Sequence, residues 1–365
     1  MKIRLLTILL GCGLALSAAH GQEQARPIPD AYTTSLDSLA LYIDSHGKSE
    51  QDKLESLYTW ITTKMSYNVY PTFVSINEKR DEHKEILQAL RSREGVCRHF
   101  ALIFRAVSER MDIPAFFIEG YTKSNGTVTP EPHAWCAALV GGQWRLYDPT
   151  FGMGHVSNHR FVRKPNYTYC KVKPEVFIRS HMPFDPLWQF LPRPLSFQEF
   201  DEGTPLPPAD GQAQVFDFAD TLRTYLRQTP VQRLTAVNER IRHNGRSNRL
   251  VDYYVQLNTS NIAVHRQNEV YNLYKNALKH YNRSVDNYNE VIRYQRVNRK
   301  IKKEGKKLIE NWLTEATTAI TSARDILQQA RQVPEQYETA VNNLMKAIED
   351  TGDKIQRLAD RSKNG

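Results

Sequence analysis

The stretch that decides the fold is HAWCAALVGGQWRLYDPTFG, residues 133–152. Two apolar runs, 133–140 and 143–150, flank a Gly141-Gly142 pair. Short apolar runs on either side of two glycines are typical of a β-hairpin with a two-residue turn. The sequence therefore predicts two antiparallel strands at this point.

The register of this hairpin brings an acid and a base together. A two-residue turn pairs Val140 with Gln143, and by counting back along both strands, His133 with Thr150. Since side chains two apart on a strand share a face, His133 and Asp148 are predicted to be diagonal neighbours on one side, within reach of an imidazole to carboxylate hydrogen bond. The same alternation places Cys136 on the opposite face, where we expect it to be a packing residue.

A cysteine stands at the start of a predicted helix upstream of the hairpin. Residues 95–107 read GVCRHFALIFRAV, and helical spacing of the apolar residues predicts a helix over 96–111. Cys97 is then at the helix N-terminus, where unpaired backbone N–H groups and the helix dipole favour a thiolate. The same N–H groups are suited to bind the oxyanion of a tetrahedral intermediate.

Three segments in this order, 95–107, IPAFFIEGY at 113–121 and 133–152, resemble the core of the transglutaminase-like superfamily, which is papain-like. The resemblance implies Cys97 as the nucleophile, His133 as the general base and acid, and Asp148 as the carboxylate that fixes the tautomer of the imidazole.

The resemblance extends to about residues 30–200. TWITTKMSYNVY at 59–70 is similar to a helix that leads into a Tyr-containing segment in the family, and HMPFDPLWQFL at 181–191 is similar to the bacterial and kyphoscoliosis-peptidase branch. Two residues depart from the pattern: Asn68, where many members have Asp, and His99, where many have a small or acidic residue.

Four residues near the triad are expected to bind substrate: Tyr67, Arg98, His99 and Trp135. For His99, on the first turn of the helix, a structural hydrogen bond is the favoured alternative. No cofactor is expected. The potential zinc ligands are Cys97, His99, His133, His155, His159 and His181, and we expect no metal because the i,i+4 pair His155 and His159 is not in a helical sequence and has no Glu between its members.

The fold class predicted for the whole is α+β, with an antiparallel sheet packed on the Cys-bearing helix and a helical domain after it. Periodicity predicts helix over about 32–65, a short helix around 86–90, a strand over 115–121 and a polar loop over 123–132. Heptad-like apolar spacing then recurs in three blocks, 271–292, 309–330 and 337–358, with Gly305 and Pro334 between them. These blocks predict an antiparallel helical bundle or coiled coil.

Composition sets the expected domain boundaries. Residues 201–214 are rich in Pro, Gly and acidic side chains, so we expect a catalytic domain at 22–205, a linker at 206–220 and a helical bundle or coiled-coil domain at 221–365. Hydrophobic residues at 40% and charged residues at 24% exclude a disordered chain and a multi-span membrane protein.

The N-terminus is predicted to be a secretory signal. Lys2 and Arg4 precede an apolar run from Leu5 to Ala19, and polar sequence follows, so residues 1–21 fit a cleaved signal peptide. This apolar run is too short to span a membrane as a helix, and we expect no transmembrane segment in the mature chain. We expect a periplasmic or secreted protein; a lipid anchor on Cys12 is the less favoured alternative.

Export leaves three cysteines, Cys97, Cys136 and Cys170, an odd number that does not suggest a disulfide framework. The helical tail is basic, with 19 Lys plus Arg against 7 Asp plus Glu between Thr221 and Glu310. We interpret this surplus as a solvated helix face in preference to an anionic partner, and export argues against nucleic acid. A partner for the helical bundle, or a second copy of the chain, is left open.

The predicted function is that of an exported thiol acyl-transfer enzyme. A cysteine peptidase or amidase would hydrolyse a peptide or amide bond of a protein or peptide substrate, such as a cell-envelope component, through a thioester. The triad is equally compatible with cross-linking of protein glutamine by a transglutaminase-type reaction. An alternative from outside the enzymes is a non-catalytic scaffold or binding protein that uses the helical tail.

Overall fold

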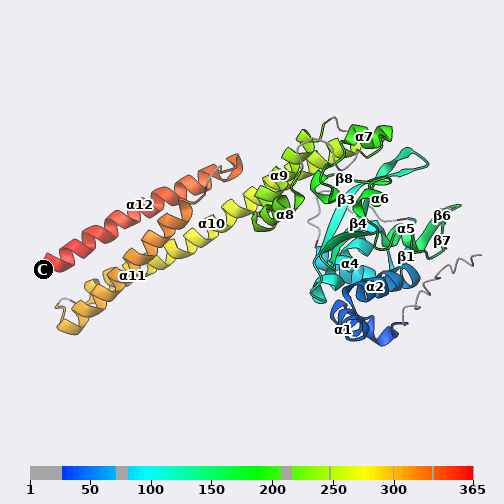
Figure 1. Cartoon of the computed structure of the whole chain (residues 1–365). Helices are drawn as coiled ribbons and strands as arrows, with labels where there is room; N and C mark the ends of the chain where they lie inside the picture. Colours follow the sequence, from blue (N-terminus) through cyan, green and yellow to red (C-terminus); the bar gives the residue numbers. More distant parts are fainter. Residues whose placement is uncertain are drawn as a thin grey trace, which may run out of the picture. The chain divides into compact units, whose positions relative to one another are not determined.

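The computed structural model describes residues 27–70, 81–206, 216–245, 248–298, 300–330 and 333–364. The expected signal peptide, Cys12 and residues 207–215 of the expected linker lie outside this part of the chain. The chain forms two compact units (Figure 1). The first unit comprises the chain up to Ile118 together with His133–Phe177, and the second comprises Glu119–Pro132 and the chain from Ile178 onward.

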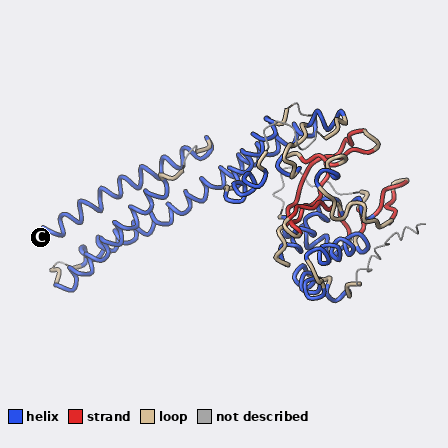
Figure 2. Tube along the Cα trace, viewed as in Figure 1, coloured by secondary structure: helices blue, strands red, loops and turns tan. Residues whose placement is uncertain are grey.

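The structure is α+β, as predicted, and its strands gather in the part of the chain before Phe218 (Figure 2). In chain order the elements up to the sheet and its hairpins are η1 (Asp30–Tyr32), α1 (Leu36–His46), α2 (Glu50–Lys64), β1 (Ser66–Tyr67), α3 (Glu82–Ser92), β2 (Glu94–Gly95), α4 (Cys97–Arg110), β3 (Ala115–Ser124), β4 (Thr127–Val140), β5 (Gln143–Tyr147), α5 (Pro149–Met153), β6 (Gly154–Ser157), β7 (Arg160–Arg163) and α6 (Pro174–Phe177). The later elements are β8 (His181–Pro183), η2 (Pro186–Gln189), α7 (Phe197–Glu202), α8 (Phe218–Arg227), α9 (Pro230–His243), α10 (Arg249–Val297), α11 (Lys303–Leu327) and α12 (Glu335–Asn364).

The helical region predicted over 32–65 is divided into α1 and α2. Gly47 leaves the helix in an extended conformation, and its N–H still donates to the carbonyl of Ile43. Ser49 then caps α2 by accepting from the N–H of Asp52. A Cβ at Gly47 would lie 2.4 Å from the side chain of Lys53, so this break needs a glycine.

The hairpin around Gly141 and Gly142 has the predicted register. The strands of the main sheet are ordered β5-β4-β3-β8, and β4 pairs antiparallel with β5 from Val140↔Gln143 to Cys136↔Tyr147. Gly141 and Gly142 have φ of 55° and 75°, which a two-residue turn of this kind requires. The ladder ends at Tyr147, and the expected pairing of His133 with Thr150 is wrong because the chain turns into α5 there.

The polar loop expected over 123–132 is a second hairpin instead. Strand β3 continues to Ser124 and β4 begins at Thr127, so the connection is Asn125 and Gly126 alone. Both have positive φ, 51° and 78°. An Asn-Gly pair is the preferred sequence for such a turn, and the polar strands around it concealed the signal.

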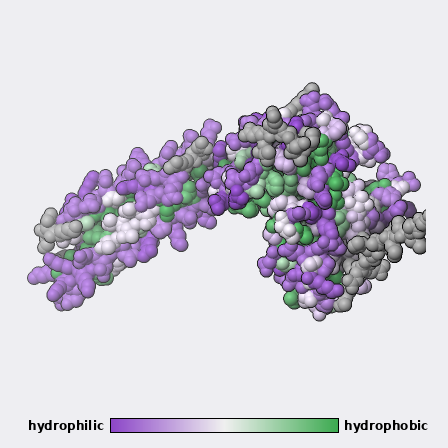
Figure 3. Space-filling model, in the orientation of Figure 1, coloured by the Kyte–Doolittle hydropathy of each residue, from purple (hydrophilic) through white to green (hydrophobic). Residues whose placement is uncertain are grey.

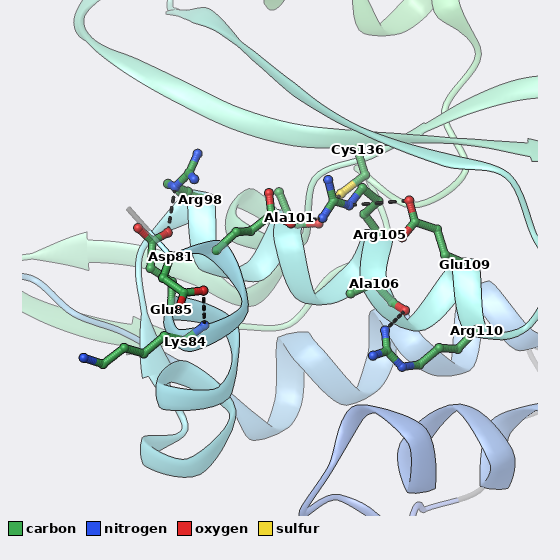
Figure 4. Close-up of polar contacts among 11 residues, drawn as sticks. Asp81, Lys84, Glu85, Arg98, Ala101, Arg105, Ala106, Glu109, Arg110 and Cys136 are labelled. Atoms are coloured by element: carbon green, nitrogen blue, oxygen red, sulfur yellow. Dashed lines mark hydrogen bonds and ion pairs between the residues drawn. The ribbon is translucent and has the colours of Figure 1, made fainter. Parts of the chain in front are cut away.

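The sheet packs on the Cys-bearing helix, as expected. The apolar stripe of α4, formed by Phe100, Ile103, Phe104 and Val107, is entirely buried. It shares one core with α1, α2 and α3 and with the side chains of Ala134, Cys136 and Ala138 from β4. Cys136 lies over α4 (Figure 4), where its thiol donates to the carbonyl of Ala101 at 3.2 Å.

In the second unit, the segment 181–191 begins with β8, which pairs with β3, and continues into contacts with helices. Phe184 stacks on Tyr254 of α10, with ring centroids 4.5 Å apart. Asp185, only 2% exposed, receives two hydrogen bonds of 2.7 Å from Arg240 of α9. One boundary between the compact units falls between Phe177 and Ile178.

The three apolar blocks of the tail lie on α10, α11 and α12, which share one buried core. Pro334 immediately precedes α12, as expected for a residue between helices. Gly305, expected to separate two blocks, is inside α11. A Cβ there would lie 2.5 Å from the hydroxyl of Tyr294, so Gly305 serves close packing between α10 and α11. Within the described residues, no helix combines the length and apolar character needed to cross a bilayer.

Replacing Arg240 with Met is expected to lower the free energy of unfolding by roughly 3 kcal/mol, because it strands the buried carboxylate of Asp185. Urea unfolding followed by circular dichroism measures the change. The control is Arg223→Met, which breaks an exposed pair with Asp220 and is expected to cost less than about 0.5 kcal/mol. Adding Asp185→Asn to Arg240→Met should recover much of the loss; equal effects of the two Arg variants would contradict this role for the pair.

Candidate active site

The thiol of Cys97 lies at the first residue of α4. Val96 before it is extended, and β1 and β2 run parallel just upstream, with Tyr67 opposite Gly95. His99 reaches back to the helix start, where its Nδ1 accepts from the N–H of Val96 at 3.0 Å. A Cβ at Gly95 would lie 2.8 Å from the Cβ of His99. Thus Gly95 and His99 together fix the backbone that carries Cys97.

Asp148 is held by hydrogen bonds at both carboxylate oxygens. It is completely buried and caps α5, with Oδ1 accepting from the N–H groups of Thr150 at 2.8 Å and Phe151 at 3.1 Å. Its own N–H donates to the carbonyl of Tyr169 at 2.9 Å. The other oxygen, Oδ2, accepts from a side-chain partner.

That partner is His133. Its Nε2 donates to Oδ2 of Asp148 at 2.8 Å, and Cys97 is close enough to the ring to raise its pKa. The ring of Phe151 stacks on the imidazole, with centroids 4.7 Å apart and an interplanar angle of 26°. With Nε2 held by the carboxylate, Nδ1 is the nitrogen left to exchange a proton with the sulfur. The predicted hydrogen bond between His133 and Asp148 is confirmed.

The electrostatics favour a protonated ring. Burial alone would lower the pKa of His133, but the charge and hydrogen bond of Asp148, with a further contribution from Cys97, raise the pKa to about 10. The imidazolium is therefore the ground state near neutral pH. A positive charge beside a sulfur favours the thiolate, which is the nucleophilic form.

A buried tyrosine supports the turn that carries Asp148. The hydroxyl of Tyr58 on α2 is placed to donate to the carbonyls of Asn166, at 3.1 Å, and Asp148, at 3.4 Å. A Cβ at Gly152 would lie 1.8 Å from this hydroxyl, so Gly152 is what lets α5 approach α2. Burial raises the pKa of Tyr58, which keeps the hydroxyl a neutral donor.

The four expected substrate-binding residues have different environments. Tyr67 is partly buried, with its ring centroid 6.4 Å from that of Phe100. Arg98 pairs with Glu85 of α3 at 3.0 Å, and Figure 4 shows it at the start of α4 beside α3. His99 makes the structural hydrogen bond described above.

The burial of Trp135 contradicts the expectation that this residue binds substrate. It is 1% exposed, and its ring lies between those of His133, at 6.1 Å, and Phe177, at 5.8 Å. A side chain so deeply buried backs the imidazole and presents no surface to a substrate.

The i,i+4 pair weighed as metal ligands is on a hairpin. His155 lies on β6 and His159 in the β6–β7 turn with φ of 58°, and both are exposed. Their spacing therefore does not align them on a helix face.

Sequence reasoning missed Phe151, Tyr58 and the carbonyl of Tyr169 as parts of the site. The segment Asp-Pro-Thr-Phe at 148–151 carried a usable signal, since Asp followed by Pro is a common start for a helix. Tyr58 carried none, because its partners are about a hundred residues away, with separations of 90 and 108 residues.

Part of the chain is similar to known proteins. Residues 37–149 match the family model of the transglutaminase-like superfamily. Kyphoscoliosis peptidase of Homo sapiens is 25% identical over 176 residues, which cover 46% of this chain and 26% of the human protein. Lim and transglutaminase domain protein ltd-1 of Caenorhabditis elegans is 25% identical over 185 residues, which cover 46% of this chain and 25% of that protein.

Among solved structures, a protein of Cytophaga hutchinsonii described as a candidate cysteine protease is 26% identical with a TM-score of 0.26, covering 34% of this chain and 40% of that one. The chain spans about a quarter of the length of the two curated relatives. The segment that matches the model of the transglutaminase-like superfamily, residues 37–149, contains Cys97, His133 and Asp148.

Proposed function

We propose that this chain is an exported cysteine peptidase or amidase in which Cys97 is the nucleophile, His133 the base and acid, and Asp148 the group that orients the imidazole. The observation that carries the proposal is the buried imidazole of His133: it contacts the carboxylate of Asp148 at 2.8 Å, and Cys97 is close enough to raise its pKa. A thiol, a base and an orienting carboxylate in contact form the unit that activates a nucleophile.

The reaction follows from these positions. His133 holds the thiol proton while the sulfur of Cys97 bonds to the substrate carbonyl carbon, and the carbonyl oxygen becomes an oxyanion. The N–H groups of His99 and Phe100 donate to the carbonyl of Val96, whereas the N–H of Cys97, at the first residue of α4, precedes these bonds and offers a donor to that oxyanion. The C–N bond then breaks, and the leaving amine takes the proton from His133, which leaves a thioester on Cys97.

Water completes the cycle in the hydrolytic reaction. His133 removes a proton from water as its oxygen bonds to the thioester carbon, the C–S bond breaks, and the acid departs while the proton returns to the sulfur and imidazole pair. An amine in place of water would give cross-linking by the same steps. The relatives named as kyphoscoliosis peptidases favour hydrolysis, and the expected signal at residues 1–21 supports export.

Alkylation of Cys97 by iodoacetamide at pH 6 is expected to be fast, and His133→Ala should slow it by at least about tenfold, because an unassisted thiol is under 1% thiolate at that pH. The rate is read from the Cys97 peptide by mass spectrometry. Cys136 and Cys170 are controls in the same digest, since burial raises the pKa of both thiols. Equal labelling of Cys97 in the two proteins would exclude His133 as its partner.

Asp148→Asn is expected to lower the pKa of His133 well below about 10, because burial is then opposed only by the contribution of Cys97. Ring NMR shifts of labelled histidine against pH measure this. The wild-type ring contributes to stability fully below pH 6.5, and the contribution is lost as pH rises through about 10. Asn retains the capping oxygen for α5, so the turn should persist. A wild-type ring that titrates near 6.5 would refute the proposed pairing.

Incubation with a glutamine-containing peptide and a fluorescent amine separates the two reactions of the thioester. We expect cleavage of the peptide or release of ammonia without incorporation of the amine. Cys97→Ser serves as the control for background hydrolysis. Amine incorporation that exceeds hydrolysis and depends on Cys97 would replace the peptidase proposal with cross-linking.

A further inference from the structure

A basic cluster lies where α10 turns into α11. Residues 293–307 read RYQRVNRKIKKEGKK and contain eight Lys or Arg and one acidic residue, Glu304. We call this stretch the basic tip. Its described residues, 293–298 and 300–307, belong to the last turn of α10 and to the segment that leads into and begins α11, and in Figure 1 they lie at one end of the α10–α11 hairpin. The proposed catalytic chemistry does not use it.

The tip is built on a fixed packing arrangement. The ring of Tyr294 makes an edge contact with Trp312 of α11, with centroids 5.8 Å apart, and its hydroxyl occupies the space that a side chain at Gly305 would need. Ile309 is buried one turn further along α11. The basic side chains are therefore presented by two helix ends held against each other.

Most of the charge on the tip has no counter-charge. Arg293 pairs with Glu290 at 2.9 Å. Five further cations of the tip are exposed, and none of them forms an ion pair with another described residue: Arg296, Lys300, Lys302, Lys303 and Lys307. Hydrophilic side chains cover this end of the hairpin in the view of Figure 3. Mutual repulsion among such neighbours is relieved by an anionic partner.

An apolar residue stands among these charges. Val297, the last residue of α10, is 75% exposed, the largest fraction among the exposed large hydrophobic residues of the described chain. It is one turn after Arg293, so these two residues share a side of the helix. Leu308, next to Lys307, is 38% exposed.

We infer that the basic tip docks on an anionic phospholipid surface, with its lysines at the phosphates and Val297 entering the boundary between headgroups and acyl chains. Clusters of four to eight Lys or Arg on a helix are suited to anionic lipid, and an apolar side chain among them adds burial that only a lipid surface offers. Single-stranded nucleic acid would use exposed aromatic rings for stacking, whereas the ring of Tyr294 is engaged with Trp312. The inference is independent of the proposed catalytic activity.

Co-sedimentation of the full chain with vesicles tests the inference. Binding is expected to vesicles of phosphatidylcholine with phosphatidylglycerol and not to phosphatidylcholine alone. Lys300→Gln, Lys302→Gln, Lys303→Gln and Lys307→Gln combined should reduce the partition coefficient at least about 100-fold, from about fivefold per lysine. Val297→Ser alone should reduce it about fivefold.

The matched control carries four exposed charges away from the tip, Arg266→Gln, Lys275→Gln, Lys279→Gln and Lys346→Gln, and should bind vesicles within about threefold of the wild type. Circular dichroism verifies that each variant is folded. If the tip variant and the control variant lose vesicle binding equally, binding depends on net charge alone and the inference is overturned. Tight binding of a labelled DNA strand, with no binding to anionic vesicles, would overturn it in favour of a nucleic-acid surface.

Discussion

The hydrogen bond between His133 and Asp148 is the constraint on which the first unit is organised. A carboxylate with no solvent exposure is costly unless every oxygen is paired, and here Oδ2 accepts from the imidazole while Oδ1 accepts from two backbone N–H groups. The same contacts end β5, start α5 and set the protonation of the ring. Folding and the proposed catalysis therefore depend on one buried charge pair, with Cys97 brought to it by the start of α4.

Much of this site was predictable because it depends on local rules. Gly141 and Gly142 fix the hairpin register, and the register alone places His133 and Asp148 on one face. The helical stripe after Cys97 likewise predicts the helix that carries it. The support from Tyr58 was not predictable, since it depends on the approach of α2 to α5, and the burial of Trp135 depends on packing against Phe177. Pairwise spacing says nothing about contacts between elements far apart in the sequence.

Glycine explains most of the errors in the predicted fold. Gly47 breaks a helix that periodicity alone continues, and Gly126 makes a tight turn that polar neighbours made look like a loop. Gly305 lies between two apolar blocks, as expected, and it is inside α11, where the hydroxyl of Tyr294 occupies the space that a side chain would need. A glycine marks a place where a side chain does not fit, and only the tertiary contacts show whether the reason is a turn or close packing.

The central claim is that the sulfur of Cys97 forms a covalent acyl bond with assistance from His133 and Asp148. Intact-mass spectrometry after acid quench, with an activated acyl ester as substrate, tests it most directly. A single acyl adduct that maps to Cys97 is expected. Neutral hydroxylamine should release it, as it releases a thioester, and the Cys97→Ala chain should form no adduct. An adduct that persists in Cys97→Ala, or that maps to Cys136 or Cys170, would contradict it.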